Sequence, residues 1–109
     1  MTREFINTPV YDKLWNDLGL TDDDLCDLQN TLLSNPQAGD IIEGAGGAAK
    51  VRYASQGKGK SGGIRVIYCD LTHKKRLYLL LCYPKSKQDD LTQEQKKQLK
   101  ALIKTLKGE

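Results

Sequence analysis

The chain has 109 residues, enough for one hydrophobic core, and we expect a single domain over residues 1–109. Charged residues interrupt its apolar runs, so none reaches the length of a membrane span, and the first residues lack the hydrophobic stretch of a secretory signal. The three cysteines show no metal-ligating spacing and are odd in number, so we expect reduced, core-packed thiols in a cytoplasmic protein with no contact to a membrane.

The net charge of +3 hides a strong asymmetry along the chain. Residues 1–49 carry two basic and nine acidic side chains, a net of −7, whereas residues 50–87 carry ten basic side chains and one acid, a net of +9. Residues 88–109 carry five basic and four acidic side chains. Such a basic segment favours a polyanionic partner, although lysines at a sheet edge that discourage aggregation are an alternative explanation.

The acidic part of the chain is predicted to form a strand over residues 3–7 and then two helices. Thr8 and the proline after it are typical of a helix start, and apolar residues at helical spacing continue to Gly19, which ends the helix. Thr21 caps a second helix whose first turn carries three aspartates, and an Asn-Pro pair ends it. Trp15 and the leucines of this helical hairpin are expected to lie in the core.

The basic part begins after a glycine-rich connection over residues 39–47, in which two isoleucines are an apolar anchor. Residues 49–54 alternate Lys50 and Arg52 on one face with apolar residues on the other, the period-two pattern of a half-buried strand. We therefore expect both cations on the same face of a sheet.

Two further strands, over residues 64–71 and 77–83, are joined by a turn that holds the chain's one histidine, His73. We expect His73 to face solvent, and a single histidine excludes a ribonuclease that uses a histidine pair. Residues 92–95 form a capping box that opens a final helix. This order predicts an α+β fold, a small, mostly antiparallel sheet with an N-terminal helical hairpin and a C-terminal helix, with the helices against one face.

Residues 57–63 contain the spacing GxGxxG, which in other contexts binds a nucleotide. A dinucleotide fingerprint needs a helix after the glycines, but a strand follows here, and the chain is too short for a kinase domain. The phosphate-loop pattern also fails, because Ala54 stands where its first glycine belongs. Two interpretations remain: a cationic loop in which Lys58 and Lys60 approach phosphates, or simply a long hairpin connection.

Four cations form the strongest constellation of the basic segment. Lys50 and Arg52 share one face, Arg65 lies near the start of the next strand, and Lys85 lies just past the end of the last. If the strands pair as consecutive hairpins, the four converge at one end of the sheet. We expect neither a metal site nor another cofactor, because the segment offers only one carboxylate, Asp70.

At these residues the sequence resembles the RelE/ParE superfamily of bacterial toxins, most of all its HigB-type members. The resemblance rests on Gly44-x-Gly46-Gly47-x-x-Lys50-Val51-Arg52-x-Ala54-Ser55, on Gly57-x-Gly59-Lys60-x-Gly62-Gly63-x-Arg65-Val66-Ile67-Tyr68, on Leu77-Tyr78-Leu79-Leu80, on Tyr83-x-Lys85 and on Asp90-Leu91-Thr92. It implies a RelE-like fold and a toxin of a type II toxin–antitoxin system. Such a toxin enters the 30S A site of the ribosome, cleaves the mRNA there, and is silenced by a cognate antitoxin that covers or distorts the basic surface.

The resemblance also implies roles for individual residues. Lys50 and Arg52 match the cationic pair of the family's first catalytic strand, Arg65 matches its phosphate-binding arginine, and Lys85 falls in its basic end-of-strand motif. The tyrosine that some relatives carry near the last helix is replaced here by acidic residues, and Tyr83 is a candidate to take its place. We assign contacts with RNA and the ribosome to Lys58, Lys60, Lys74, Lys75, Arg76, Lys87 and Tyr83.

The implied reaction is attack of a ribose 2′-OH on the adjacent phosphate with loss of the 5′-oxygen, which needs a proton acceptor and stabilisation of an anionic transition state. Arginine suits the second task, and Lys50 or Lys85 suits the first only where neighbouring cations favour the neutral amine. Two other functions stay open: a ParE-like gyrase poison, whose members generally lack the full cationic set, and a non-catalytic RNA- or ribosome-binding module.

Overall fold

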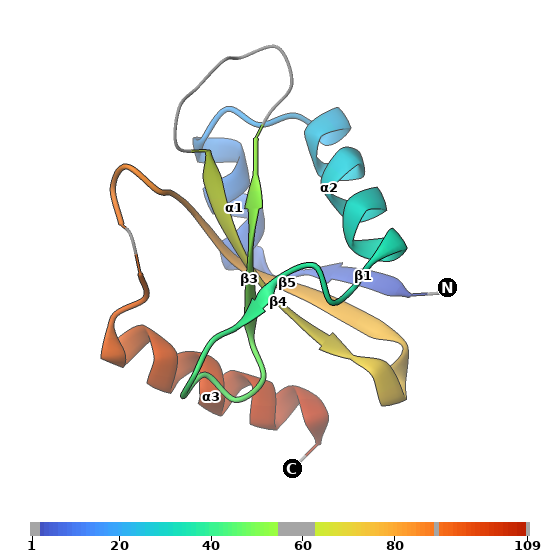
Figure 1. Ribbon diagram of the computed structural model, residues 1–109, viewed down its shortest axis with the longest axis vertical. Helices are drawn as coiled ribbons and strands as arrows, with labels where there is room; N and C mark the ends of the chain where they lie inside the picture. The colour runs from blue at the N-terminus through green and yellow to red at the C-terminus, as the bar shows by residue number, and fades with distance from the viewer. Residues whose placement is uncertain (1–2, 55–62, 89, 109) are drawn as a thin grey trace.

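A twisted sheet forms the centre of the molecule, with helices packed against it (Figure 1). The structure is a computed structural model, and it describes residues 3–54, 63–88 and 90–108. In chain order the elements are β1 (Glu4–Asn7), α1 (Pro9–Asp17), α2 (Asp22–Ser34), β2 (Asp40–Ile41), β3 (Ala49–Tyr53), β4 (Ile64–Leu71), the 3₁₀ turn η1 (Thr72–Lys74), β5 (Arg76–Pro84) and α3 (Gln93–Lys107).

The strands of the described residues lie in the order β1-β5-β4-β3-β2. β1 runs parallel to β5, and the other neighbours pair antiparallel as consecutive hairpins. The predicted α+β fold with a mostly antiparallel sheet is therefore confirmed. The very short β2, which the sequence pattern did not reveal, lies at the edge beside β3.

Local side-chain contacts set the helix starts where the sequence predicts them. The hydroxyl of Thr8 accepts a hydrogen bond from the backbone N–H of Tyr11, 3.1 Å away. Thr21 and Thr92 each form a complete capping box with the third residue of the helix. These contacts satisfy backbone donors that have no partner within a helix, and so each helix begins at a defined residue.

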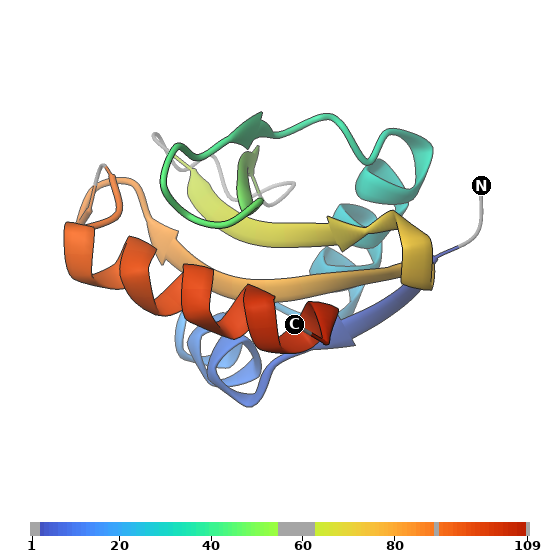
Figure 2. The ribbon, with the colours of Figure 1, turned by 90° about the horizontal axis from the view of Figure 1, so that it is seen from below.

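Two hydrophobic cores lie on opposite faces of the sheet. The first contains Trp15 of α1 and Leu28 and Leu32 of α2, packed on one face of β3, β4 and β5. The second contains Leu99 and Ile103 of α3 together with the loop over residues 42–48. Figure 2 shows α3 on one side of the sheet and α1 and α2 on the other. The prediction that all helices cover one face is wrong.

The sequence of β4 explains the second core. Val66 and Tyr68 face the first core, whereas Ile67 and Cys69 face the second. A strand that is apolar at successive positions must be covered on both faces, because either face left bare would expose hydrophobic surface to water. In β3, apolar residues alternate with polar ones, which indicates one buried face. In β4, apolar residues follow one another, which indicates that both faces are buried.

The loop over residues 42–48 closes part of the second core. Ile42 is buried, while its neighbour Ile41 is exposed, so only one of the two isoleucines is an anchor. Gly46 has a φ of +71°, and a β-carbon there would stand 3.0 Å from the Cα of Lys100 in α3. Glycine therefore permits both the turn and the close contact of this loop with α3.

Three further expectations concern single residues. His73 is exposed in η1, as predicted. Cys69 and Cys82 are buried free thiols, as expected, but Cys26 is exposed, so the prediction of a core position is wrong for that cysteine. None of the described helices combines the length and the apolar character needed to cross a membrane.

Candidate functional site

Three neighbouring strands place two arginines and a tyrosine in one row across the sheet. Arg52 of β3 pairs with Arg65 of β4, and Arg65 pairs with Tyr83 of β5. Directly paired residues of antiparallel strands point to the same face, so the three side chains share the face that α3 covers further along. Lys50 lies on this face too, because it pairs with Ile67 of the second core. We call Lys50, Arg52 and Arg65 the cation cluster.

Members of the cation cluster differ in how far they reach into solvent. Arg52 is exposed, Arg65 is half-buried, and 28% of the Lys50 side chain is exposed. Among the described residues, the Nε of Arg65 is a buried donor without a hydrogen-bond partner. A buried, unsatisfied donor is costly, and a positively charged fork of this kind matches the oxygens of a phosphate.

Lys50 is engaged by a carboxylate that sequence reasoning did not assign to the site. Its Nζ donates a hydrogen bond to Oδ1 of Asp90 over 3.1 Å, and the two form an ion pair. This hydrogen bond, the charge of Lys50 and the charges of Lys96 and Arg65 hold the pKa of Asp90 below its ordinary value. Asp90 is therefore ionised at neutral pH while most of its side chain is exposed to solvent.

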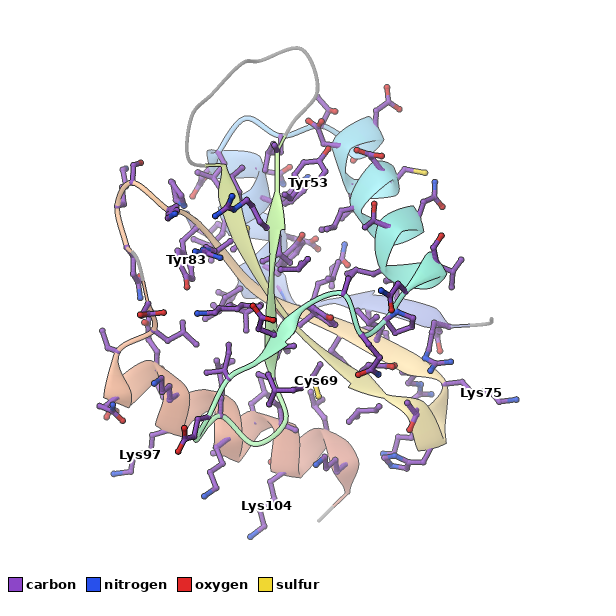
Figure 3. All side chains as sticks on the ribbon, in the orientation of Figure 1. Tyr53, Cys69, Lys75, Tyr83, Lys97 and Lys104 are labelled. Atoms are coloured by element: carbon purple, nitrogen blue, oxygen red, sulfur yellow. The ribbon has the colours of Figure 1, made fainter. Side chains whose placement is uncertain are left out.

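A pocket of about 170 Å³ opens beside this ion pair. Its walls include Lys50, Asp90 and Lys96, together with Glu43 from the loop over residues 42–48, and Tyr83 contributes to its lining. The Tyr83 side chain is only 8% exposed. Figure 3 shows it between the strands and the segment that leads to α3, so Tyr83 forms part of the wall and packs in the sheet as expected of a strand tyrosine.

Lys85 lies at the same end of the sheet as Arg65. Its backbone N–H donates to the carbonyl of Gly63, just before β4, over 3.3 Å. Lys87 is exposed in the turn that follows β5. The predicted convergence of Lys50, Arg52, Arg65 and Lys85 on one end of the sheet thus agrees with the strand register. Lys58 and Lys60 lie outside the described residues.

The basic group at the turn lies at the other end of the sheet. Lys74 donates to the carbonyl of Leu106 in α3 over 2.8 Å, and Arg76 forms an exposed ion pair with Glu4 at 3.3 Å. Lys75 is exposed beside them, as Figure 3 shows. Six residues of β4 separate this end from Arg65, which is about 20 Å at the usual rise of a strand. The structure therefore does not bring these three residues to the cation cluster.

A further set of cations lies on α3. At 100° per residue its lysines fall within an arc of about 100°, beside the face that packs on the second core. We call these residues the lysine arc: Lys96, Lys97, Lys100, Lys104 and Lys107. Only one acidic residue, Glu94, belongs to this helix. The sequence signal was present as a helical period among the lysines, but the charge count over residues 88–109 concealed it, since a count takes no account of where the charges lie around a helix.

The position of Asp90, in the segment from β5 to α3, explains why the sequence alone did not assign this residue to the site. Nothing local in the sequence indicates a partner for its carboxylate. Lys50 is 40 positions away and meets Asp90 only because the segment that follows β5 returns to β3. No three His, Cys, Asp or Glu side chains among the described residues gather closely enough to hold a metal ion.

Residues 4–108 match the model of the RelE toxin of the RelE/RelB toxin–antitoxin system. The chain belongs to the RelE toxin family. This assignment agrees with the expected superfamily, whereas the HigB-type subgroup stays a prediction.

Solved structures confirm the RelE fold of this family member. The toxin is similar to a chain of the intact Escherichia coli RelBE toxin–antitoxin complex, with a TM-score of 0.57 and 18% identity over 77% of this chain and 96% of that one. It is also similar to a mutant of the E. coli toxin RelE in the free state, in which two arginines are replaced by alanine. That match has a TM-score of 0.57 and 16% identity, over 82% of this chain and 90% of that one.

Proposed function

We propose that this RelE-family toxin is a ribosome-dependent endoribonuclease of the HigB type that cleaves mRNA in the 30S A site and so inhibits translation in the cytoplasm. The observation that carries the proposal is the half-buried guanidinium of Arg65, whose Nε has no hydrogen-bond partner among the described residues. Arg52 stands opposite it on β3. Two arginines side by side on one face, with a donor still to be satisfied, form a receptor for a phosphate.

The proposed catalytic residues are Lys50, Arg52, Arg65 and Lys85. Arg65 and Arg52 would hold the non-bridging oxygens of the scissile phosphate and stabilise the extra negative charge of the transition state. The positive charge that this reaction needs comes from these side chains, and the scheme has no step for a metal ion. Lys50 lies on the same face and forms an ion pair with Asp90 at 3.1 Å, so it would add positive charge beside the phosphate.

The lysines of α3 extend the positive surface away from the cation cluster. Lys96 lines the pocket beside Lys50, and the rest of the lysine arc follows along the helix. A ribosome-dependent enzyme needs such a surface, since contacts with ribosomal RNA phosphates would orient the protein without reading sequence. We assign Lys58, Lys60 and Lys87 to the same kind of contact, and Lys74, Lys75 and Arg76 to contacts with RNA at the other end of the sheet. Tyr83 is only 8% exposed and is not assigned to a phosphate contact.

We also propose that a cognate antitoxin is the protein partner of this toxin. One of the similar solved structures is a toxin–antitoxin complex, and the face with the cation cluster carries a strong local positive charge. A segment with acidic side chains would bind this face through charge complementarity and would keep RNA away from Arg65.

The first prediction concerns Arg65. Primer extension on cellular mRNA during induced expression should show cuts at defined codon positions for the wild-type toxin. Arg65→Ala should reduce the cleavage rate about 10²- to 10³-fold, because it removes the buried donor group aimed at the phosphate. Lys13→Ala is a matched control that also removes one positive charge, from the exposed Lys13–Asp17 pair on α1, and should leave cleavage unchanged.

The same experiment separates the two other functions. DNA breaks that depend on gyrase, without mRNA cuts, would establish a gyrase poison and overturn the proposal. Binding to ribosomes without cuts in any mRNA would establish a non-catalytic module. Equal cleavage by Arg65→Ala and the wild type would remove Arg65 from the site while leaving the activity itself intact.

A further inference from the structure

The cation cluster supplies positive charge but contains no group suited to take up the proton of the 2′-OH. The guanidinium groups of Arg52 and Arg65 stay protonated, and an arginine does not act as a base at neutral pH. The Nζ of Lys50 already donates a hydrogen bond to Oδ1 of Asp90 over 3.1 Å. The Tyr83 side chain packs in the sheet and is only 8% exposed.

Of the residues that the structure describes, two carboxylates line the pocket beside the cluster, Asp90 and Glu43. They differ in their relation to Lys50. Asp90 is hydrogen-bonded to its Nζ, whereas Glu43 is an exposed side chain of the loop over residues 42–48. Asp90 is also 71% exposed, so an RNA strand lying on the cluster can reach its carboxylate from solvent.

We infer that Asp90 is the general base of the cleavage reaction and that Lys50 holds its carboxylate in place. This inference rests on the proposed ribonuclease function, and it gives Asp90 a catalytic role that neither the cation count nor the family resemblance indicated. Asp90 would touch the 2′-OH and is therefore a further catalytic residue. For the proton transfer, Lys50 would act as the positioning residue of Asp90, in addition to its proposed role beside the phosphate.

The reaction balances with these groups. The 2′-oxygen bonds to phosphorus while its proton passes to the Asp90 carboxylate, and the bond from phosphorus to the 5′-oxygen breaks. The leaving 5′-oxygen takes a proton from a water molecule at this open edge of the sheet. Asp90 then returns its proton to the hydroxide so formed, and the products are a 2′,3′-cyclic phosphate and a 5′-hydroxyl.

Charges around Asp90 decide how the rate depends on pH. Lys50 on β3, Arg65 on β4 and Lys96 on α3 face it with positive charge, and Tyr83 and Glu43 complete the pocket. Because these cations lower the pKa of Asp90, its basic form is fully present throughout the neutral range. Activity is lost only as the pH falls toward that lowered pKa, well below neutrality. A lysine base would instead make the rate rise about tenfold per pH unit up to alkaline pH.

The test uses the full-length toxin on ribosomes that carry a defined mRNA in the A site, in single turnover. The wild-type rate should be constant within about threefold between pH 6 and pH 8.5. Asp90→Asn should lower the rate about 10²- to 10⁴-fold with unchanged ribosome binding, and Asp90→Glu should recover part of it. Glu94→Gln is a matched control, because it removes an exposed carboxylate from the first turn of α3 and should leave the rate unchanged.

Other outcomes overturn the inference. A faster Asp90→Asn variant would mean that the carboxylate merely occupies the place of the RNA phosphate on Lys50. A rate that rises tenfold per pH unit, or a slower rate found in Glu43→Gln and not in Asp90→Asn, would assign the proton transfer to another group. If the wild-type toxin itself produces no cleavage, the proposed function fails; if it cleaves and Asp90→Asn cleaves equally well, only the role of Asp90 fails.

Discussion

Individual residues of one type behave differently in this toxin because their surroundings differ. Cys82 and Cys69 are buried in the sheet, and burial raises the pKa of the Cys82 thiol to about 12. Burial also raises the pKa of Cys69, against the opposing effect of Lys107. Cys26 is exposed on α2. Reaction with alkylating reagents requires the thiolate, so burial and a raised pKa both protect a thiol.

This contrast predicts a selective reaction with iodoacetamide at pH 8. The folded toxin should be labelled at Cys26 within minutes, while Cys69 and Cys82 stay unlabelled. Peptide mass spectrometry would locate the label, and in denaturant all three cysteines should react at similar rates. Rapid labelling of Cys82 in the folded toxin would contradict its enclosed position.

At the site, the sequence correctly predicted the orientation of those side chains whose face depends only on alternation along a strand. Lys50 and Arg52 lie on one face because successive strand residues point to opposite faces. Prediction from the sequence failed for Asp90, since the ion pair with Lys50 depends on a return of the chain that no local pattern records. Charge identity was visible in the sequence, and the pairing of the charges was not.

At the level of elements, α3 has two distinct surfaces. Leu99 and Ile103 are buried against the sheet, and the lysine arc lies beside this apolar face. Its start was predictable from the capping box at Thr92, because capping contacts lie within four residues. The face of the sheet on which α3 lies was not predictable, since an apolar helix face fits either side of a strand that is apolar on both.

The lysine arc leads to a prediction about salt dependence. Replacing Lys97, Lys100 and Lys104 by alanine should weaken ribosome binding. It should also reduce the slope of the logarithm of the binding constant against the logarithm of the salt concentration by about 2, because each RNA phosphate that a lysine no longer neutralises contributes about 0.7 to that slope. Binding titrations at several salt concentrations would measure this slope. A matched control is Thr105→Ala on the same helix, which changes no charge and should keep the wild-type slope. A triple variant with the wild-type slope would show that the arc binds no phosphates.

For the molecule as a whole, the two cores share β4 and β5. Tyr68 and Cys69 are neighbours in β4 yet belong to different cores, so neither core can lose its packing without affecting the strand that supports the other. We therefore expect the described fold to unfold as one cooperative unit.

The single tryptophan makes this expectation testable, because Trp15 lies in the first core. Ile103→Ala, in the second core, should lower the free energy of unfolding by about 2–5 kcal/mol. Trp15 fluorescence and far-UV circular dichroism should both report this shift, with coincident midpoints in urea. Leu32→Ala in the first core is the matched control and should shift both probes in the same way. A fluorescence midpoint that Ile103→Ala leaves unchanged would mean that the cores unfold separately.

Local patterns in the sequence determined the helix starts, the four longer strands, the face shared by Lys50 and Arg52, and, through the motifs around them, the family. These features depend on neighbours within a few positions or on alternation along one strand, and so the amino-acid order is sufficient. Only the tertiary structure decided that α3 covers the face opposite α1 and α2, that Arg52 stands beside Arg65, and that Asp90 meets Lys50. The basic segment that first indicated a polyanionic partner is thus divided between two ends of a sheet, because strand pairing and chain return place residues that are distant in sequence side by side.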